Sequence, residues 1–316
     1  MPVQNLTPRQ LTALHTTASN QFQESFVDQQ GNRDLWWRDF VVDVTTDLEY
    51  KDIDWFKLMY NISLSNRKVA PNYRELTGET HRMYTERYTT AIREDKYNLI
   101  ANNGEGQGDL LRAIEEFASY APQFPQDLMV NQLILGNTAQ VIVWDGLPLF
   151  DNAHPRGGVT FDNLLAGALN AATFQAARTA MMRFPSDEGA NLPMRGVPTD
   201  LLVPPDLEYN ARGLMNNTVL PGGTNDEMNT IQGMANVKVD ALFTDVNDWY
   251  LIMNKPGQMK PFTYLKHSLD GDPATRVFDN DDMADIYHNE EFKWELKWQM
   301  GVIPNRPEQF IKVVNA

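Results

Sequence analysis

The chain contains no cysteine, so it can form no disulfide, no thiolate nucleophile and no cysteine-ligated metal site. It also contains no run of about 18 apolar residues, the length that a membrane-spanning helix needs. Its first residues, Met1–Asn5, lack a basic region followed by an apolar stretch. We therefore expect no secretory signal, no membrane contact and synthesis in the cytoplasm.

Positive charge is scarce. The chain has 27 Lys and Arg residues against 42 Asp and Glu residues, for a formal net charge of −15. A dedicated nucleic-acid-binding protein usually carries a basic face, so this balance argues against that class. It is compatible with a container for DNA, because an acidic wall repels phosphate and lets a packaged duplex slide. The alternative is that the acidic charge only keeps the protein in solution.

Residues that could build an active site or a metal site are few and poorly spaced. Asp151 and His154 suggest a metal site or an acid–base pair, but none of the other four histidines falls at a helical or hairpin spacing to them, which favours a structural turn. The acidic run Asp279–Asp285 departs from a calcium-binding EF-hand loop at Ala284, where glycine is needed, and we interpret it as a solvated turn. We therefore expect no catalytic residue, no cofactor and no metal ligand.

The remaining composition is that of a packed protein with both helices and strands. Apolar residues make up 42% of the 316 residues and include seven Trp, which argues for globular structure, and the length suggests about two domains. Apolar residues at helical spacing, with Pro and capping residues at the ends, predict four helical regions. These lie after Thr7–Pro8, from Asp109 to Leu135 with Pro122 and Pro125 kinking or dividing the helix, within Phe161–Met182, and from Pro204 to Met215.

Alternating or β-branched segments predict the strands. The clearest segment is Glu291–Trp298, in which Phe292, Trp294, Leu296 and Trp298 share one face and charged residues fill the other. Further strands are predicted at Leu35–Val44, Asp200–Val203, Val237–Leu242, Trp249–Met253 and Phe310–Val314.

An extended hairpin is predicted between residues 81 and 108. Its first strand carries apolar and aromatic side chains on one face, Arg93–Lys96 forms the turn, and Tyr97–Ile100 returns, followed by a flexible Gly-rich break. Such a hairpin lacks a full apolar face and is hard to stabilise alone in water, so we expect another copy of the chain to cover it. The candidate subunit-interface residues are Tyr84, Tyr88, Ile92, Lys96 and Tyr97.

Adjacent Trp36 and Trp37 extend this set of candidates. Neighbouring side chains in a strand point to opposite faces, so each indole needs its own cover. An interface with another copy and a core strand buried on both sides both fit this pattern. The helix after Pro8 leaves the same alternatives, because it could pack on a neighbouring subunit or on its own chain.

The segment Gln140–Pro155 is the most distinctive part of the sequence. It predicts a strand, a tight turn at Asp145–Gly146, a second apolar segment and a polar exit at His154–Pro155. The segment resembles part of the Mu-like major head subunit family, the coat proteins of certain tailed bacteriophages. The order of the other features is also similar to that family, through the opening helix, Tyr84–Asn98, Asn163–Leu165, Leu201–Glu208 with Ala211 and Arg212, and Trp249–Leu251.

This resemblance implies the α+β major capsid fold of tailed phages. It implies an N-terminal arm in residues 1–80, an extended hairpin loop in 81–108, a peripheral domain with a long spine helix in 109–160 and 281–316, and an axial α/β domain in 161–280. The prolines at positions 122 and 125 depart from a single unbroken spine helix. Lys96 at the hairpin tip invites comparison with coat proteins that form Lys–Asn cross-links, whereas a solvated lysine is the plain alternative.

The function implied by the resemblance is assembly. Copies would associate as hexamers and pentamers of an icosahedral shell that encloses double-stranded DNA without reading its sequence. The implied partners are other copies of the chain, a scaffold, a portal and a head protease during assembly, and a decoration protein. The implied location is the virion, after assembly in the host cytoplasm.

Two other classes remain open from the sequence. An acidic α/β hydrolase would need a convergent cluster of acids and histidine, which these spacings do not supply. Another phage structural protein, such as a tail or decoration component, would lack an α/β domain inserted between a spine helix and a returning strand.

Overall fold

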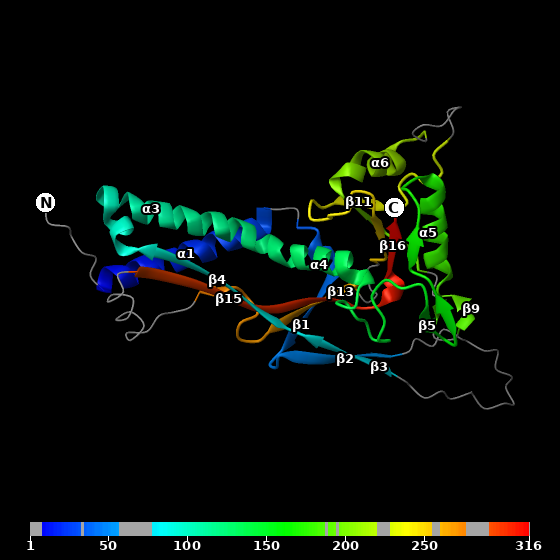
Figure 1. Ribbon diagram of the computed structural model, residues 1–316, viewed down its shortest axis with the longest axis horizontal. Coiled ribbons are helices and arrows are strands. Elements are labelled where there is room, and N and C mark those ends of the chain that lie inside the picture. Colours follow the sequence, from blue (N-terminus) through cyan, green and yellow to red (C-terminus); the bar gives the residue numbers. More distant parts are fainter. Residues whose placement is uncertain are drawn as a thin grey trace, which may run out of the picture.

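The computed structural model describes residues 8–32, 35–56, 78–186, 189–193, 196–219, 228–254, 260–275 and 291–315. The molecule is elongated, with a long two-stranded ribbon under two helices at one end and a five-stranded sheet with two further helices at the other (Figure 1). The predicted mixture of helices and strands is confirmed. Within the described residues, no helix combines the length and the apolar character needed to cross a membrane.

The helices account for much of the elongated shape. They are α1 (Pro8–Asn32), α2 (Trp37–Phe40), α3 (Lys96–Tyr120), α4 (Phe124–Ile134), α5 (Ala171–Arg183) and α6 (Pro205–Asn216), with short 3-10 turns η1 (Ala121–Gln123), η2 (Leu135–Asn137) and η3 (Pro307–Gln309). Pro122 and Pro125 lie where α3 gives way to η1 and α4. Proline cannot donate the backbone hydrogen bond of a helix interior, so the predicted break at these residues is confirmed as two helices in line.

The strands form two larger sheets and three small hairpins. The first sheet has the order β1 (Val41–Thr46), β13 (Phe262–His267), β15 (Glu291–Pro304) and β14 (Ala274–Thr275), with β4 (Glu86–Asp95) also pairing with β15. The second has the order β11 (Asn236–Val239), β10 (Asp200–Val203), β12 (Trp249–Ile252), β16 (Phe310–Val314) and β7 (Leu164–Ala166). The hairpins are β2 (Tyr50–Phe56) with β3 (Gly78–Tyr84), β5 (His154–Arg156) with β6 (Val159–Phe161), and β8 (Pro185–Ser186) with β9 (Gly189–Pro193).

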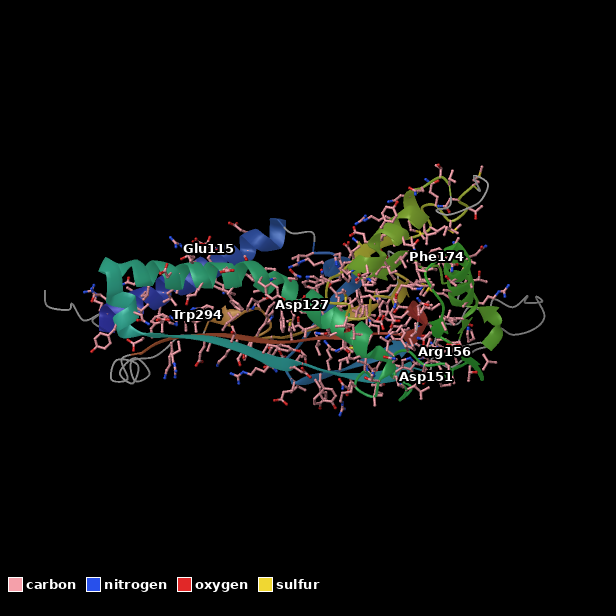
Figure 2. The ribbon with its side chains drawn as sticks, turned by 45° about the horizontal axis from the view of Figure 1, so that its top comes forward. Glu115, Asp127, Asp151, Arg156, Phe174 and Trp294 are labelled. Atoms are coloured by element: carbon pink, nitrogen blue, oxygen red, sulfur yellow. The ribbon has the colours of Figure 1, made fainter. Side chains whose placement is uncertain are left out.

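Strands β4 and β15 form the long ribbon. They pair antiparallel over ten residues, from Glu86 opposite Met300 to Asp95 opposite Glu291. The predicted alternation of β15 is confirmed, because its aromatic and apolar residues are buried on the face that α1 and α3 cover. Trp294 is fully buried between the ribbon and the helices, with its ring centroid 5.5 Å from that of Phe22 in α1 (Figure 2).

The predicted hairpin at 81–108 is wrong. Tyr97–Ile100 does not return as a strand, because the Asp95 side chain accepts a hydrogen bond from the Tyr97 N–H and caps α3. The Gly-rich stretch also lies inside this helix. Glycine is needed at position 106 of this helix. A Cβ there would clash with the backbone carbonyl of Asn98 in the first turn of α3. Strand β4 pairs instead with β15, and the hairpin of this region is β2–β3, which precedes β4.

The predicted strand Leu35–Val44 is only partly right. The structure has the short helix α2 before β1 begins at Val41. A helical turn lets Trp36, Trp37 and Phe40 all reach the same core, with Trp36 and Phe40 packed edge to face at 5.3 Å, whereas a strand would send neighbouring rings to opposite faces. Burial of three aromatic rings therefore outweighs the strand preference of the segment.

The predicted helix within 161–182 begins at Ala171, after the first apolar residues of the pattern that predicted it. Leu164 and Leu165 lie in β7, which pairs in parallel with β16. Asn170 and Thr173 then form a reciprocal capping box that fixes the start of α5. The helix near Pro204–Met215 is confirmed as α6, and the strands predicted near residues 200, 237, 249 and 310 are confirmed as β10, β11, β12 and β16.

The second sheet separates two apolar cores. Leu201 and Leu251 lie on the face that α5 and α6 cover, whereas the neighbouring Leu202 and Tyr250 point into the core of the first sheet. The register places Leu201 opposite Leu251, and Leu251 opposite Ile311, so the alternation continues across three strands. Because both of its faces are apolar, this sheet packs against a core on each side and so joins the two halves of the molecule.

Candidate assembly surfaces and a buried polar junction

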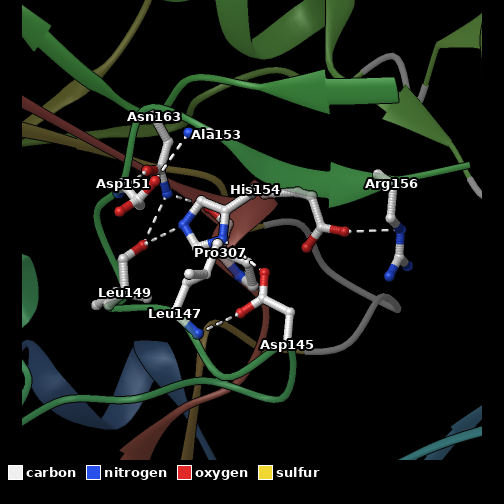
Figure 3. Close-up of polar contacts among 10 residues, drawn as sticks. Asp145, Leu147, Leu149, Asp151, Ala153, His154, Arg156, Asn163 and Pro307 are labelled. Atoms are coloured by element: carbon white, nitrogen blue, oxygen red, sulfur yellow. Dashed lines mark hydrogen bonds and ion pairs between the residues drawn. The ribbon is translucent and has the colours of Figure 1, made fainter. Parts of the chain in front are cut away.

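A buried polar junction links the turn at Asp145 to the strand β5 (Figure 3). The Nδ1 atom of His154 lies 2.7 Å from Oδ2 of Asp145, and its Nε2 atom lies 3.2 Å from the carbonyl oxygen of Leu149. A doubly protonated imidazole would donate both bonds, whereas the neutral ring can donate only one. The Asp145 Oδ1 atom accepts the Leu147 N–H at 3.1 Å, which holds the tight turn in place.

Asn163 completes the junction. Its side-chain nitrogen donates to the carbonyl oxygens of Leu149 at 2.8 Å and Pro307 at 3.0 Å, and its side-chain oxygen accepts the Asp151 N–H at 2.9 Å. One fully buried amide thus joins segments that are far apart in the sequence. The junction is sealed from solvent, which suits structural support rather than chemistry on a substrate.

The structure pairs His154 with Asp145 and not with Asp151. The Asp151 carboxylate instead accepts the Ala153 N–H at 2.9 Å, a local turn of the kind that the sequence favours. Among the described residues, no group of three or more His, Asp or Glu side chains is placed to hold a metal ion. The acidic run Asp279–Asp285 lies outside the described residues.

Two buried ion pairs lie next to the junction. The Arg156 Nε atom is 2.9 Å from Oε1 of Glu308, and the Lys312 Nζ atom is 3.3 Å from Oδ2 of Asp248. The Arg156 guanidinium also lies over the ring of Trp144, 5.1 Å from its centroid. Each pair ties the C-terminal segment to an earlier part of the chain, and loss of either partner would leave a buried charge without its counterion.

A groove of about 540 Å³ opens beside the hairpin β2–β3. We call it the Tyr84 groove, and its lining includes residues 81–84, 140–143 and 301–304. Tyr84 and Ile142 are 58% and 41% exposed, so the groove presents apolar surface to solvent. Burial lowers the pKa of His81 in its wall, and the nearby Asp145 carboxylate partly offsets this change.

Of the interface residues predicted from the sequence, Tyr84 and Tyr88 meet at this groove. Tyr88 is half-buried, packs edge to face on Phe124 at 4.9 Å, and donates a hydrogen bond to Glu86 at 3.1 Å. Burial and the neighbouring Glu86 carboxylate raise the pKa of the Tyr88 hydroxyl. Tyr88 therefore supports the wall of the groove, while Tyr84 is its exposed side chain.

The other predicted residues lie elsewhere. Ile92 packs in part against the chain's own core, and Lys96 is the first residue of α3 rather than a hairpin tip. Tyr97 is 54% exposed at the far end of the ribbon, away from the Tyr84 groove. Trp36 and Trp37 are buried within this chain, where the Trp37 N–H donates to the Pro122 carbonyl oxygen at 3.2 Å.

Sequence reasoning missed Ile142 as a surface residue. The segment Gln140–Val143 reads as a strand, but the structure has only an isolated bridge between Ile142 and Pro148, which leaves Ile142 open to solvent. The pairing of the Asp52 carboxylate with the Arg82 guanidinium, 2.7 Å apart on the exposed hairpin, was also missed. Opposite charges facing each other at the β2–β3 register were the signal that could have revealed it.

The arrangement of the two sheets and long helices is that of phage capsid proteins. The capsid of bacteriophage JBD30 superposes with a TM-score of 0.54 at 13% identity, covering 65% of this chain and 90% of that one. The mature capsid of bacteriophage PhiM1 gives a TM-score of 0.55 at 13% identity, covering 90% and 88%. Microbacterium phage Oxtober96 gives 0.52 at 9% identity, covering 88% and 90%. These likenesses define the fold.

The family follows from the sequence itself. A model of the family described as phage capsid protein matches residues 86–313, well over half of the chain. The chain belongs to the phage capsid protein family, and its function is that of a major capsid protein, a structural component of the virion. None of the curated proteins compared with it by sequence matches.

Proposed function

We propose that copies of this chain assemble as hexamers and pentamers of an icosahedral shell that encloses double-stranded DNA. The observation that carries the proposal is the Tyr84 groove beside the protruding hairpin β2–β3. Exposed apolar surface at Tyr84 and Ile142 favours burial against another subunit. Shell proteins bury large shared interfaces, often above about 2,000 Å² in total, so many weak contacts add up to a stable particle.

The division into functional regions is part of this proposal. We assign residues 109–160 and 281–316 to a peripheral domain and 161–280 to an axial domain near the five- and six-fold axes. The second apolar core supports the axial assignment, because it draws on residues between Phe161 and Met253, together with Ile311 and Val313. Helix α1 packs on α3 over the ribbon of its own chain, so we do not assign this helix to an arm that crosses to a neighbour.

Within the family, we place the chain with the Mu-like major head subunits, on the resemblance of Gln140–Pro155. In that case assembly in the host cytoplasm would involve a scaffold, a portal and a head protease, and a decoration protein would bind the finished shell. The interface would include Tyr84 with Tyr88 behind it, and Tyr97 at the far end of the ribbon, while Trp36 and Trp37 are buried in the chain's own core and lie outside it.

Electron microscopy of the purified full-length chain tests the proposal. Closed shells whose averaged surfaces show clusters of five and six subunits are the expected result. Filaments or rings of one size would point to a tail component. A compact monomer under all assembly conditions would contradict the proposal.

A further inference from the structure

The helices cover the two strands of the ribbon unevenly. The inner-face side chains of β15 are buried, namely Phe292, Trp294, Leu296 and Trp298. Their register partners on β4 are only half-buried, namely Glu94, Ile92, Thr90 and Tyr88. The helix layer is therefore complete over β15 and incomplete over β4.

The position of α1 explains this difference. Leu296 and Lys297 of β15 pair with both β4 and β14, so these two strands lie on opposite edges of β15. The Gln23 side chain of α1 donates to the carbonyl oxygen of Pro273, next to β14, at 3.0 Å. Helix α1 thus lies toward β14 and leaves the β4 side of the ribbon to α3 and the start of α4.

An apolar hollow of about 200 Å³ lies on this side, between β4 and the turn where α3 meets α4. We call it the β4 hollow. Its lining is mostly aromatic and consists of Tyr88, Thr89, Thr90, Phe117, Tyr120, Ala121, Phe124, Leu296 and Trp298. Tyr120 is 47% exposed, so part of the hollow faces solvent. Apolar surface of this kind is stabilised when another group covers it.

The backbone edge of β4 beside the hollow is open in the described part of the chain. β4 pairs with β15 along one edge, and no described backbone group bonds Tyr88–Ile92 along the other. An open edge presents a row of N–H and C=O groups to which a further strand can add, and many proteins protect such edges with charged side chains or proline. Tyr88–Ile92 contains neither, although Arg87 and Arg93 flank it.

The open edge and the hollow together fit an extended polypeptide strand. In strand addition, main-chain hydrogen bonds to the edge supply affinity, and alternate side chains of the added strand enter pockets on one face. A strand of five residues, about 17 Å long, spans Tyr88–Ile92. One bulky apolar side chain of that strand would enter the β4 hollow beside Thr90. A small molecule could fill the hollow but would leave the strand edge unpaired.

Continuity with the Tyr84 groove indicates the source of this strand. Tyr88 lines both the groove and the β4 hollow, and Glu86, the first residue of β4, also lines the groove. A neighbouring copy that covers the groove therefore lies next to the open edge of β4.

We propose that an extended segment of a second copy of this chain adds to the edge of β4 as a third strand of the ribbon and inserts an apolar side chain into the β4 hollow. The inference rests on the proposed function in taking the shell as the assembly that brings the second copy to this edge. The added strand would shield Tyr88, Thr90 and Ile92, as the helices already shield their register partners on β15.

The absence of cysteine allows a direct test by site-specific photocross-linking. Thr89→Cys carries a benzophenone label on the exposed face of β4, pointing away from the helices and next to the open edge. Thr17→Cys, on the exposed side of α1, is the matched control. Each labelled full-length chain is assembled with isotope-labelled copies and irradiated, and mass spectrometry separates cross-links between copies from those within one copy.

We expect label at Thr89 to attach to one extended segment of a second copy in shells, at least about fivefold more often than label at Thr17. The same labelled chain before assembly should give no cross-link between copies. Shells in which label at Thr89 attaches only within its own copy, or to scattered positions of other copies, would overturn the inference and leave the proposed function standing.

A second pair of variants changes the hollow itself. Thr90→Glu places a carboxylate in the β4 hollow, whereas Thr90→Val keeps the β-branched shape. Because an unpaired charge is costly to bury under an added strand, Thr90→Glu should lower the yield of shells at least about tenfold, and Thr90→Val by less than about twofold. Thr90 is only half-buried in the single chain, so both variants should fold, which circular dichroism checks.

Equal yields of shells from the two Thr90 variants would overturn the inference. If Thr90→Glu does not fold, cross-linking at Thr89 decides the question alone. Shell formation by the unsubstituted chain is measured separately by electron microscopy, and its absence would overturn the proposed function and this inference together.

Discussion

The Nδ1 atom of His154 lies 2.7 Å from Oδ2 of Asp145, and both side chains are almost entirely shielded from solvent. This contact closes the segment between the tight turn and β5. Leu147 and Leu149 of that segment form backbone hydrogen bonds with Val143 and Val141, which line the Tyr84 groove. The groove is therefore supported from behind by a polar contact rather than by apolar packing alone.

Replacing Asp145 by Ala should destabilise the unassembled chain by about 1–3 kcal/mol, because it leaves the buried Nδ1 atom of His154 and the Leu147 N–H without their hydrogen-bond partner. The matched control is Asp109→Ala on the exposed side of α3, which should stay within about 0.5 kcal/mol. Urea unfolding followed by circular dichroism gives both values. Equal stabilities for the two variants would show that the buried contact does not support the fold.

The ribbon offers a test of the core at its covered face. Trp294→Ala removes a fully buried indole that packs on Phe22 and Phe117, and should cost about 3–5 kcal/mol in the free energy of unfolding. Lys293→Ala, one residue away on the opposite face of β15, should change it by less than about 0.5 kcal/mol. A similar cost for both substitutions would contradict the alternation that defines the two faces.

Asp127 predicts a dependence of stability on pH. Burial raises the pKa of its carboxyl above the ordinary value of 3.8, against a hydrogen bond from Tyr120 that lowers it. The folded state then holds the proton more tightly than the unfolded state. The protonated carboxyl therefore contributes to the free energy of unfolding below about pH 3.8, and this contribution is lost as pH rises through the pKa of the folded state.

Asp127→Asn does not ionise and keeps a side-chain oxygen to accept the Tyr120 hydroxyl. Its stability relative to the unsubstituted chain should therefore increase as pH rises from about 4 and become constant above the folded pKa. Unfolding in urea at a series of pH values measures the difference. A difference that stays constant, or one that decreases with pH, would rule out a raised pKa at Asp127.

The sequence predicted elements whose signal is local. The alternation of Glu291–Trp298, the prolines between α3 and α4, and the turn at Asp145–Gly146 each depend on residues close together in the chain, and each is confirmed. The same holds for α6, which Pro205 opens at its first turn.

The pairing of distant segments could not be predicted in this way. The segment Tyr84–Ile100 alone is compatible with a hairpin. Its strand β4 pairs instead with β15, some two hundred residues later, whose aromatic face decides the pairing. Tyr97 is then free to enter the helix α3. His154 likewise had two carboxylates nearby in sequence. The fold of the turn, which brings Asp145 and not Asp151 to its Nδ1 atom, decides between them.

We expect the Tyr84 groove to join one copy of the chain to another. Tyr84→Asp together with Ile142→Asp would place two charges in that interface, whereas Tyr84→Phe with Ile142→Val keeps its apolar surface. Both positions are exposed in the single chain, so both variants should fold as the unsubstituted protein does.

Sedimentation velocity of the three proteins under assembly conditions measures whether this contact forms. We expect rapidly sedimenting shells from the unsubstituted chain and from the conservative variant, and only small species from the double aspartate variant. Shells of normal size and yield from the double aspartate variant would contradict it.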